Sequence, residues 1–184
     1  MSNRTMAVAM AVALVCVSSA AQGIQIQLDY SLDTFGFFTD TARRDVMQAA
    51  VDYFEPHLTD DLLAINPGGR NSWSAGMWHP ATGEWYYEDN PTIPADTMVI
   101  YVGGRDLAAL GQAGPGGYSA SGTQTFLNTV ASRGEGTTSG AGATDFGPWG
   151  GSATFDTGAS WYFDADPSTD EVFSGYDFYS VALH

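Results

Sequence analysis

The sequence predicts an α+β fold with mixed α/β elements, in which helices pack against a twisted, mostly parallel sheet that has an edge strand. Residues 24–30, IQIQLDY, alternate between apolar and polar side chains, which is typical of a half-exposed strand near a sheet edge. An amphipathic segment runs from Asp40 or Thr41, the expected N-cap, to Pro56, which ends the helix. Residues 98–102 are apolar throughout, as in a strand buried on both faces. This order of elements predicts a βαβ unit with parallel strands and a right-handed crossover.

The middle of the chain contains signals for one more strand and one more helix. Residues 62–85 are expected to contain another strand, and the stretch HPATG at 79–83 has the composition of a turn. Residues 121–134 follow a helical pattern with Ser121 as the cap. The apolar face of this second helix would be formed by Leu127, Val130 and Ala131.

The last third of the chain begins with a glycine-rich loop at 134–151, which lacks the spacing of a phosphate-binding loop. The stretches SATFD at 152–156 and SWYF at 160–163 predict two short strands around a turn. Residues 174–177, Ser-Gly-Tyr-Asp, have the spacing of a capping box and predict the start of a helix. Its apolar stripe is Phe178, Val181 and Ala182, and His184 is the last residue of the chain.

Composition favours one globular domain and excludes some partners. The chain has 184 residues, of which 44% are hydrophobic and 13% aromatic, so it can form a packed core. Its six basic residues are all arginines, and 21 Asp and Glu residues give a formal net charge of −15. Such an acidic surface repels nucleic acid and anionic lipid, so we expect neither as a partner. We expect a monomer.

Residues 1–21 have the features of a secretory signal peptide. Arg4 precedes an apolar stretch at 6–17, and Ser19-Ala20-Ala21 provides small residues for cleavage after Ala21. The apolar stretch is too short for a membrane span, which needs about 20 residues. The only cysteine, Cys16, lies inside this segment, so the mature chain would contain no disulfide. We therefore expect a secreted, extracellular or periplasmic protein.

The chain has three histidines, and only His184 belongs to the last predicted helix. His57 at a helix end and His79 before Pro80 have plain structural explanations. The stretches GGSATFDTGASWYF and YDFYSVALH, however, resemble the secreted zinc metalloproteases of the metzincin group, especially bacterial matrixin-like enzymes. The residues that match the motifs of these enzymes are Gly150, Gly151, Ala153, Phe155, Asp156, Trp161, Val181, Ala182 and His184. The resemblance covers nearly all of the mature chain, from Ile24 to the end.

The resemblance implies a zincin-like fold, of which residues 22–184 would form the N-terminal part of the catalytic domain. In this family, a helix reading H-E-x-x-H places two histidines on one face, where they bind zinc. His184 matches the first of them and would be a Zn²⁺ ligand. The general-base Glu, the second His and the third ligand would follow, so the 184 residues alone should not hydrolyse peptides. The family also implies that Gly151, Ser152, Ala153 and Thr154 form the edge strand that pairs with an extended peptide substrate.

The resemblance also raises the question of structural metals. Asp156 matches a calcium-binding position and is a candidate Ca²⁺ ligand, together with Asp145 and glycine carbonyls. Solvation of a loop explains these acids equally well. Thr154 stands where the family has the histidine of a second zinc site. The acids of FDADPSTDE, namely Asp164, Asp166, Asp170 and Glu171, pose the same choice, and the missing calcium-loop spacing favours solvated side chains.

Two other function classes remain open from the sequence. A secreted carbohydrate-binding or adhesion module would use aromatic side chains as stacking surfaces. The candidates are Trp73, Trp78, Trp85, Tyr86 and Tyr87, although such clusters more often belong to a core or stabilise a hairpin. A calcium-stabilised structural module without catalysis is the second alternative.

Overall fold

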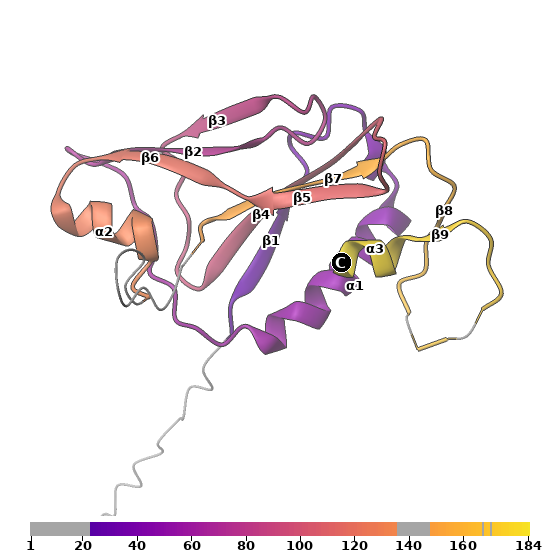
Figure 1. Ribbon diagram of the computed structural model, residues 1–184. Coiled ribbons are helices and arrows are strands. Elements are labelled where there is room, and N and C mark those ends of the chain that lie inside the picture. Colours follow the sequence, from indigo (N-terminus) through magenta and orange to yellow (C-terminus); the bar gives the residue numbers. More distant parts are fainter. Residues whose placement is uncertain (1–22, 136–147, 167, 170) are drawn as a thin grey trace, which may run out of the picture.

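The computed structural model describes residues 23–135, 148–166, 168–169 and 171–184. Helices and strands are mixed in this part of the chain, and the predicted α+β class is confirmed. A four-stranded sheet lies between a three-stranded sheet on one side and helices on the other (Figure 1). The predicted signal peptide and Asp145 lie outside the described residues.

The four-stranded sheet is mostly parallel, as the sequence predicts. Its order is β1 (Gln25–Asp29), β4 (Thr97–Arg105), β7 (Gly150–Asp156) and β5 (Gly111–Pro115). The pairs β1–β4 and β4–β7 are parallel, whereas β5 runs antiparallel to β7. Strand β1 lies at one edge, in agreement with its alternating pattern. Strand β4 is central and buried on both faces.

Helix α1 (Thr41–Phe54) connects β1 to the second sheet and completes the predicted βαβ unit with β4. Asp40 is its N-cap and accepts a hydrogen bond from the Ala42 amide at 3.0 Å. The buried residues of the helix are Val46, Met47, Ala50 and Val51. Ala42 and Tyr53, near the two ends of the helix, are exposed. Short 3₁₀ turns at Phe37–Thr39 (η1) and Glu55–His57 (η2) flank the helix.

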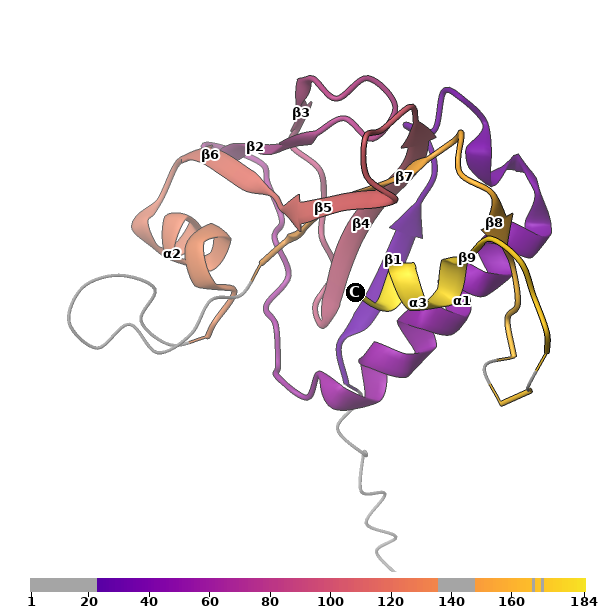
Figure 2. The ribbon, with the colours of Figure 1, turned by 45° about the vertical axis from the view of Figure 1, so that its right-hand side comes forward.

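The second sheet is antiparallel and contains the strand expected in residues 62–85. Its order is β3 (Trp85–Asp89), β2 (Ser72–Trp78) and β6 (Gly117–Ser121). The predicted turn at 79–83 joins β2 to β3. Strands β5 and β6 were not predicted, and they follow each other through Gly116, passing from one sheet to the other (Figure 2).

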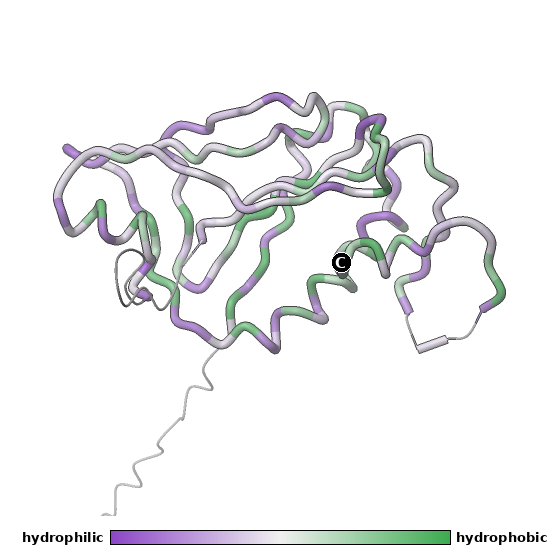
Figure 3. Tube along the Cα trace, viewed as in Figure 1, coloured by the Kyte–Doolittle hydropathy of each residue, from purple (hydrophilic) through white to green (hydrophobic). Residues whose placement is uncertain are grey.

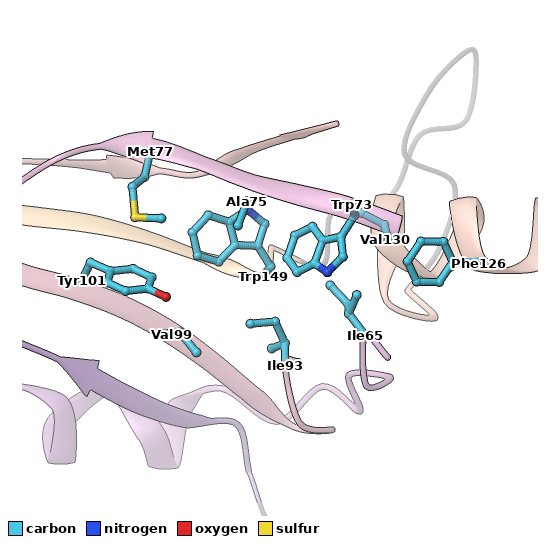
Figure 4. Packing of buried hydrophobic residues seen from close by; sticks show 10 residues of the cluster. All are labelled: Ile65, Trp73, Ala75, Met77, Ile93, Val99, Tyr101, Phe126, Val130 and Trp149. Carbon is cyan, nitrogen blue, oxygen red and sulfur yellow. The ribbon is translucent and has the colours of Figure 1, made fainter. Parts of the chain in front are cut away.

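Two hydrophobic clusters fill the two sides of the four-stranded sheet. The first lies between the sheets, where Trp73, Ala75 and Met77 of β2 face Trp149 and Tyr101 (Figure 4). The second lies on the helix side and joins α1 to the phenylalanines around Phe178. Figure 3 shows the hydrophobic stretches of β1 and β4 that run between these clusters. Burial on both faces explains why residues 98–102 are uninterruptedly apolar.

Helix α2 (Gln124–Ser132) begins later than predicted. Its N-cap is Thr123, whose hydroxyl accepts from the Phe126 amide at 3.3 Å, because Ser121 is the last residue of β6. The buried residues are Phe126 and Val130, whereas the predicted Leu127 and Ala131 are half-buried.

Arg133 ends helix α2 in a left-handed conformation, with φ of 52°. Its side chain is fully buried and donates to the backbone carbonyls of Leu63, Thr97, Pro148 and Pro94. Burial lowers the pKa of this guanidinium to about 10, and Asp96 acts in the opposite direction. Arg133 therefore joins α2 to the loops around both sheets.

The C-terminal segment differs from the expected pair of short strands. Strand β8 (Trp161–Tyr162) pairs in parallel with β9 (Tyr176–Asp177), rather than with the strand before it. Helix α3 (Phe178–Leu183) begins at Asp177, whose carboxylate accepts from the Ser180 amide at 3.2 Å. The N-cap is therefore Asp177 and not Ser174. Among the described residues, no helix has the length and hydrophobicity to cross a membrane.

Candidate functional site

The end of helix α3 and the edge strand β5 border a cleft of about 680 Å³. His184 and Val181 line it on the helix side, and Gln112 and Ala113 line it on the strand side. Phe155 belongs to its apolar floor. The cleft lies on the helix side of the four-stranded sheet, where α3 packs against α1 (Figure 2).

Helix α3 is held in place by Phe178, which has no exposed surface. Its ring centroid lies 4.5 Å from that of Phe155 on β7 and 5.2 Å from that of Trp161. It also lies 6.0 Å from Phe38 and 5.0 Å from Phe163. Because these rings come from three separate segments, the direction of this short helix is fixed by packing rather than by its own length.

Asp156 connects the end of β7 to the loop that leads into β5. Its Oδ1 accepts from the Leu107 amide at 3.0 Å, and its own amide donates to the Leu110 carbonyl at 2.9 Å. Its carbonyl accepts from Trp161 Nε1 at 2.7 Å. Asp156 thus fixes the start of the edge strand and the ring that packs on Phe178.

The predicted edge strand is not at the edge. Residues Gly151, Ser152, Ala153 and Thr154 lie in β7, which has β4 on one side and β5 on the other. All four residues are buried. Their backbone groups are used by these two neighbours, so the expectation that they pair with a peptide is wrong. The edge that borders the cleft is β5.

Strand β5 presents a defined set of backbone groups at this edge. Two hydrogen bonds show which residues of β5 bond to β7. The Asp156 N–H donates to the Leu110 carbonyl at 2.9 Å, and the Gly116 N–H donates to the Gly150 carbonyl at 2.8 Å. In an antiparallel pair the hydrogen-bonded positions alternate. The N–H and C=O groups of Gly111 and Ala113 therefore point away from β7. Among the described strands, none pairs with this side of β5.

His184 is the only one of the three histidines that reaches the cleft. It is exposed, and its amide donates to the Ser180 carbonyl at 3.2 Å in the last turn of α3. His57 Nδ1 lies 2.7 Å from the Tyr53 carbonyl, at the end of α1. His79 Nδ1 lies 3.2 Å from the Ala81 amide, inside the turn between β2 and β3. The structural interpretation of these two residues is supported by the bonds they make.

The described residues do not form a complete metal site by themselves. Within 23–135, 148–166, 168–169 and 171–184, no group of three His, Cys, Asp or Glu side chains could hold a metal ion. His184, which lines the cleft, has an imidazole side chain of the kind that can ligate zinc.

Three of the acids considered for calcium, Asp156, Asp164 and Asp166, accept hydrogen bonds from other protein groups. Oδ1 of Asp156 holds the Leu107 amide, as described above. Asp166 Oδ1 accepts from the Ser168 hydroxyl at 2.6 Å, and this bond lowers the pKa of Asp166. Asp164 Oδ1 accepts from the Asp166 amide at 2.9 Å. Glu171 is exposed, and Asp170 lies outside the described part of the chain. These contacts fit solvated, loop-stabilising acids.

Strand β5 lines the cleft but was not predicted from the sequence. Its sequence, GQAGP, has two glycines, a proline and no β-branched residue, so it reads as a loop. A signal does exist at Gly151, where a Cβ atom would lie 2.3 Å from the Gly114 carbonyl oxygen. A glycine inside a strand can mark the close approach of another backbone. That signal does not say which segment approaches.

Comparison with known proteins adds no assignment. No protein-family model, curated protein or solved structure matches this chain. The functional interpretation therefore depends on the residues and geometry described above.

Proposed function

We propose that this chain is the N-terminal part of a secreted zinc-dependent endopeptidase, with His184 as its first zinc ligand. The observation that carries this proposal is the position of His184, which faces a cleft whose opposite wall is the edge strand β5. A histidine that can ligate zinc and an unpaired strand edge, both on one cleft, are two of the parts that a zinc peptidase uses. The proposal includes export through residues 1–21 and a monomeric enzyme.

The substrate would be an extended peptide that adds to the sheet beside β5. Gly111 and Ala113 would each donate one N–H and accept at one C=O, which is the usual mode of strand addition. Pro115 has no N–H and limits the pairing to the first part of the strand. The apolar floor at Phe155 and Val181 would accept a hydrophobic side chain of the peptide.

His184 would coordinate the metal through a neutral imidazole nitrogen. The chemistry that a bound zinc ion supplies is the activation of a water molecule for attack on the peptide carbonyl. The general base and the remaining ligands are proposed to follow His184, in the order of the metzincin helix motif. The contribution of the described residues is to aim α3, through Phe178, so that this helix passes along the cleft.

The product of the complete reading frame tests the proposal. We expect stoichiometric zinc, and cleavage of peptide substrates that ceases on chelation and returns with Zn²⁺. His184→Ala should abolish both zinc binding and cleavage, whereas the matched change His79→Ala should leave zinc content unchanged. A zinc-free protein, or cleavage that survives His184→Ala, would overturn the proposal.

The edge strand has a separate test with the same protein. Ala113→Pro removes the outward N–H of β5, so we expect a raised KM with unchanged zinc content. Ala113→Ser keeps the N–H and should behave like the wild type. Equal kinetics for the two variants would exclude β5 as the substrate strand while leaving the zinc ligand assignment in place.

A further inference from the structure

The outer face of the three-stranded sheet, which we define as the side turned away from β4, is unlike a plain solvent-exposed surface. Trp73, Ala75 and Met77 of β2 point inward, toward Trp149 and Tyr101 (Figure 4). The alternate residues of β2 therefore form the outer face.

The register arranges the outer face into cross-strand rows. Trp78 lies opposite Trp85. The next row places Gly76 between Tyr87 and Gly117, and the following row places Ser74 between Asp89 and Ser119. Ser72 and Ser121 form the last row. The outer face is thus aromatic at one end and rich in hydroxyl groups at the other.

Three aromatic side chains remain exposed at the first end. Relative exposure is 53% for Trp78, 41% for Trp85 and 57% for Tyr87. The Trp85 ring is nearly perpendicular to both neighbours, at 88° to Trp78 and 76° to Tyr87, with centroids 5.2 and 6.1 Å away. Of the other two candidates named from the sequence, Trp73 is buried and Tyr86 is half-buried on the inner side. Burial in the hydrophobic core therefore does not explain the presence of Trp78, Trp85 and Tyr87.

The glycines of the middle row, Gly76 and Gly117, have no side chains, so the aromatic rings can lie close against the sheet. A Cβ atom on Gly76 would lie 2.9 Å from Trp85 Cζ2 and 3.0 Å from Tyr87 Cε1. A Cβ atom on Gly117, one strand further, would lie 3.5 Å from Trp85 Cζ2. The indole of Trp85 thus reaches over the backbone of two strands. This arrangement orients the rings before any ligand binds, which lowers the entropy cost of binding.

The hydroxyl-rich end forms an open hollow of about 280 Å³. Serines of β2 and β6 line it together with Asp89 and Asn90. Ser74 Oγ donates to Asp89 Oδ1 at 2.6 Å, which leaves the second carboxylate oxygen able to accept from a ligand. Asn90 Oδ1 is occupied by the Trp73 amide at 3.0 Å, so its NH₂ group is the available donor. No lysine or arginine is among the described residues that line the hollow.

We propose that this outer face binds a neutral polysaccharide. Sugar rings would stack on Trp78, Trp85 and Tyr87, and their hydroxyl groups would hydrogen-bond in the serine hollow. A pyranose ring has an apolar C–H face, which can stack on an aromatic ring. It also has a rim of hydroxyl groups, which can hydrogen-bond to the small hydroxyl side chains of the hollow. Successive rows are about 7 Å apart along the strands, so a ligand that contacts two rows must extend at least this far.

Charge and polarity decide between the possible occupants. The single carboxylate of the outer face and the net charge of −15 disfavour an anionic glycan or nucleic acid. An apolar protein partner would leave the hydroxyls and Asp89 buried without partners, which is unfavourable. A neutral, hydroxylated ligand satisfies both halves of the surface.

The outer face and the proposed peptide cleft are on opposite sides of the four-stranded sheet (Figures 1 and 2). Saccharide binding would therefore be independent of peptide cleavage, and its success or failure does not depend on the zinc proposal. Its role would be to hold the protein on a glycan-coated or polysaccharide surface.

Affinity electrophoresis in native gels containing hydroxyethylcellulose, xylan or laminarin tests the proposal, with anionic alginate as the charge control. We expect at least one neutral polysaccharide, and not alginate, to retard the chain. Trp78→Ala and Tyr87→Ala should each weaken binding about five- to tenfold, the loss of one ring stack. Tyr87→Phe, which keeps the ring, should bind like the wild type.

Tyr118 provides the matched control, because it is an exposed aromatic residue in the same sheet but belongs to the opposite alternation. Tyr118→Ala should bind like the wild type. A second measurement needs no variant: soluble oligosaccharides of the retarding polymer should protect tryptophan fluorescence from acrylamide, since Trp78 and Trp85 are exposed. Absence of retardation by all three neutral polymers, or equal loss in the Tyr87→Ala and Tyr118→Ala variants, would overturn the proposal.

Discussion

Asp156 accepts a hydrogen bond from the amide of Leu107, a residue 49 positions earlier in the chain, at 3.0 Å. This bond ties the end of an inner strand to the loop that starts the edge strand. The family resemblance made Asp156 a candidate calcium ligand, and the contact with Leu107 provides a different reason for a carboxylate at this position.

Asp156→Ala should lower the free energy of unfolding by about 1–3 kcal/mol, because the half-buried Leu107 amide loses its acceptor. Asp156→Asn keeps an acceptor oxygen and should lose less than half as much. Urea unfolding measures both variants, with exposed Asp166→Ala as the control, expected within about 0.5 kcal/mol of the wild type. If chelation of calcium destabilises the wild type and not Asp156→Asn, Asp156 is a metal ligand and this explanation is wrong.

Arg133→Met should destabilise the protein by about 3 kcal/mol or more, because four backbone carbonyls lose their buried donor. Arg133→Lys keeps a charge but not the planar fork, so it should recover only part of the loss. Exposed Arg70→Met is the control and should have little effect. The measurement is equilibrium unfolding in urea, and equal stability of the Arg70 and Arg133 variants would contradict the role of Arg133.

Alkaline pH should destabilise the fold through buried tyrosines. Burial raises the pKa of Tyr30 to about 12, and burial together with Glu88 raises the pKa of Tyr101. Between pH 10 and 12 the folded state keeps protons that the unfolded state has lost, so stability falls as pH rises through this range. The lowered pKa of Arg133 acts in the opposite direction but involves one proton against two. Tyr30→Phe should reduce the slope of stability against pH in this window, and an unchanged slope would contradict the assignment.

Phe178→Ala should cost about 3–5 kcal/mol, because it leaves a cavity among the five aromatic rings that anchor α3. The half-exposed Phe173 stacks on Tyr162 outside this cluster, so Phe173→Ala should cost much less. Hydrogen exchange of the α3 amides should speed up in the Phe178 variant before global unfolding does. Unchanged exchange would show that other contacts hold the helix.

The sequence predicted correctly those helices and strands whose pattern of apolar and polar residues lies entirely within their own segment. The alternation of 24–30 and the apolar run at 98–102 correctly indicated an edge strand and a central strand. Asp40 capped the helix as expected. These features depend on residues that are close in sequence and on which side chains are buried. Both can be inferred from the order of apolar and polar residues.

The failures have one physical origin, which is pairing with distant segments. Ser121 has the chemistry of a cap, but it pairs with Ser72 in a sheet, so Thr123 caps the helix instead. Ser174 loses the same role because Tyr176 and Asp177 pair with β8 before the helix starts. The site was affected most: β5 has no strand propensity of its own and exists because β7 provides a partner. Sequence therefore located His184 but not the other wall of its cleft.

The coding DNA downstream of the His184 codon tests the central claim most directly. The account predicts that the reading frame continues with Glu, two further residues and His, followed by a third ligand a turn or two beyond. That result would place a complete zinc-binding helix motif at the end of α3. A frame that continues without Glu and His at these positions would contradict the peptidase proposal, whatever the cleft binds.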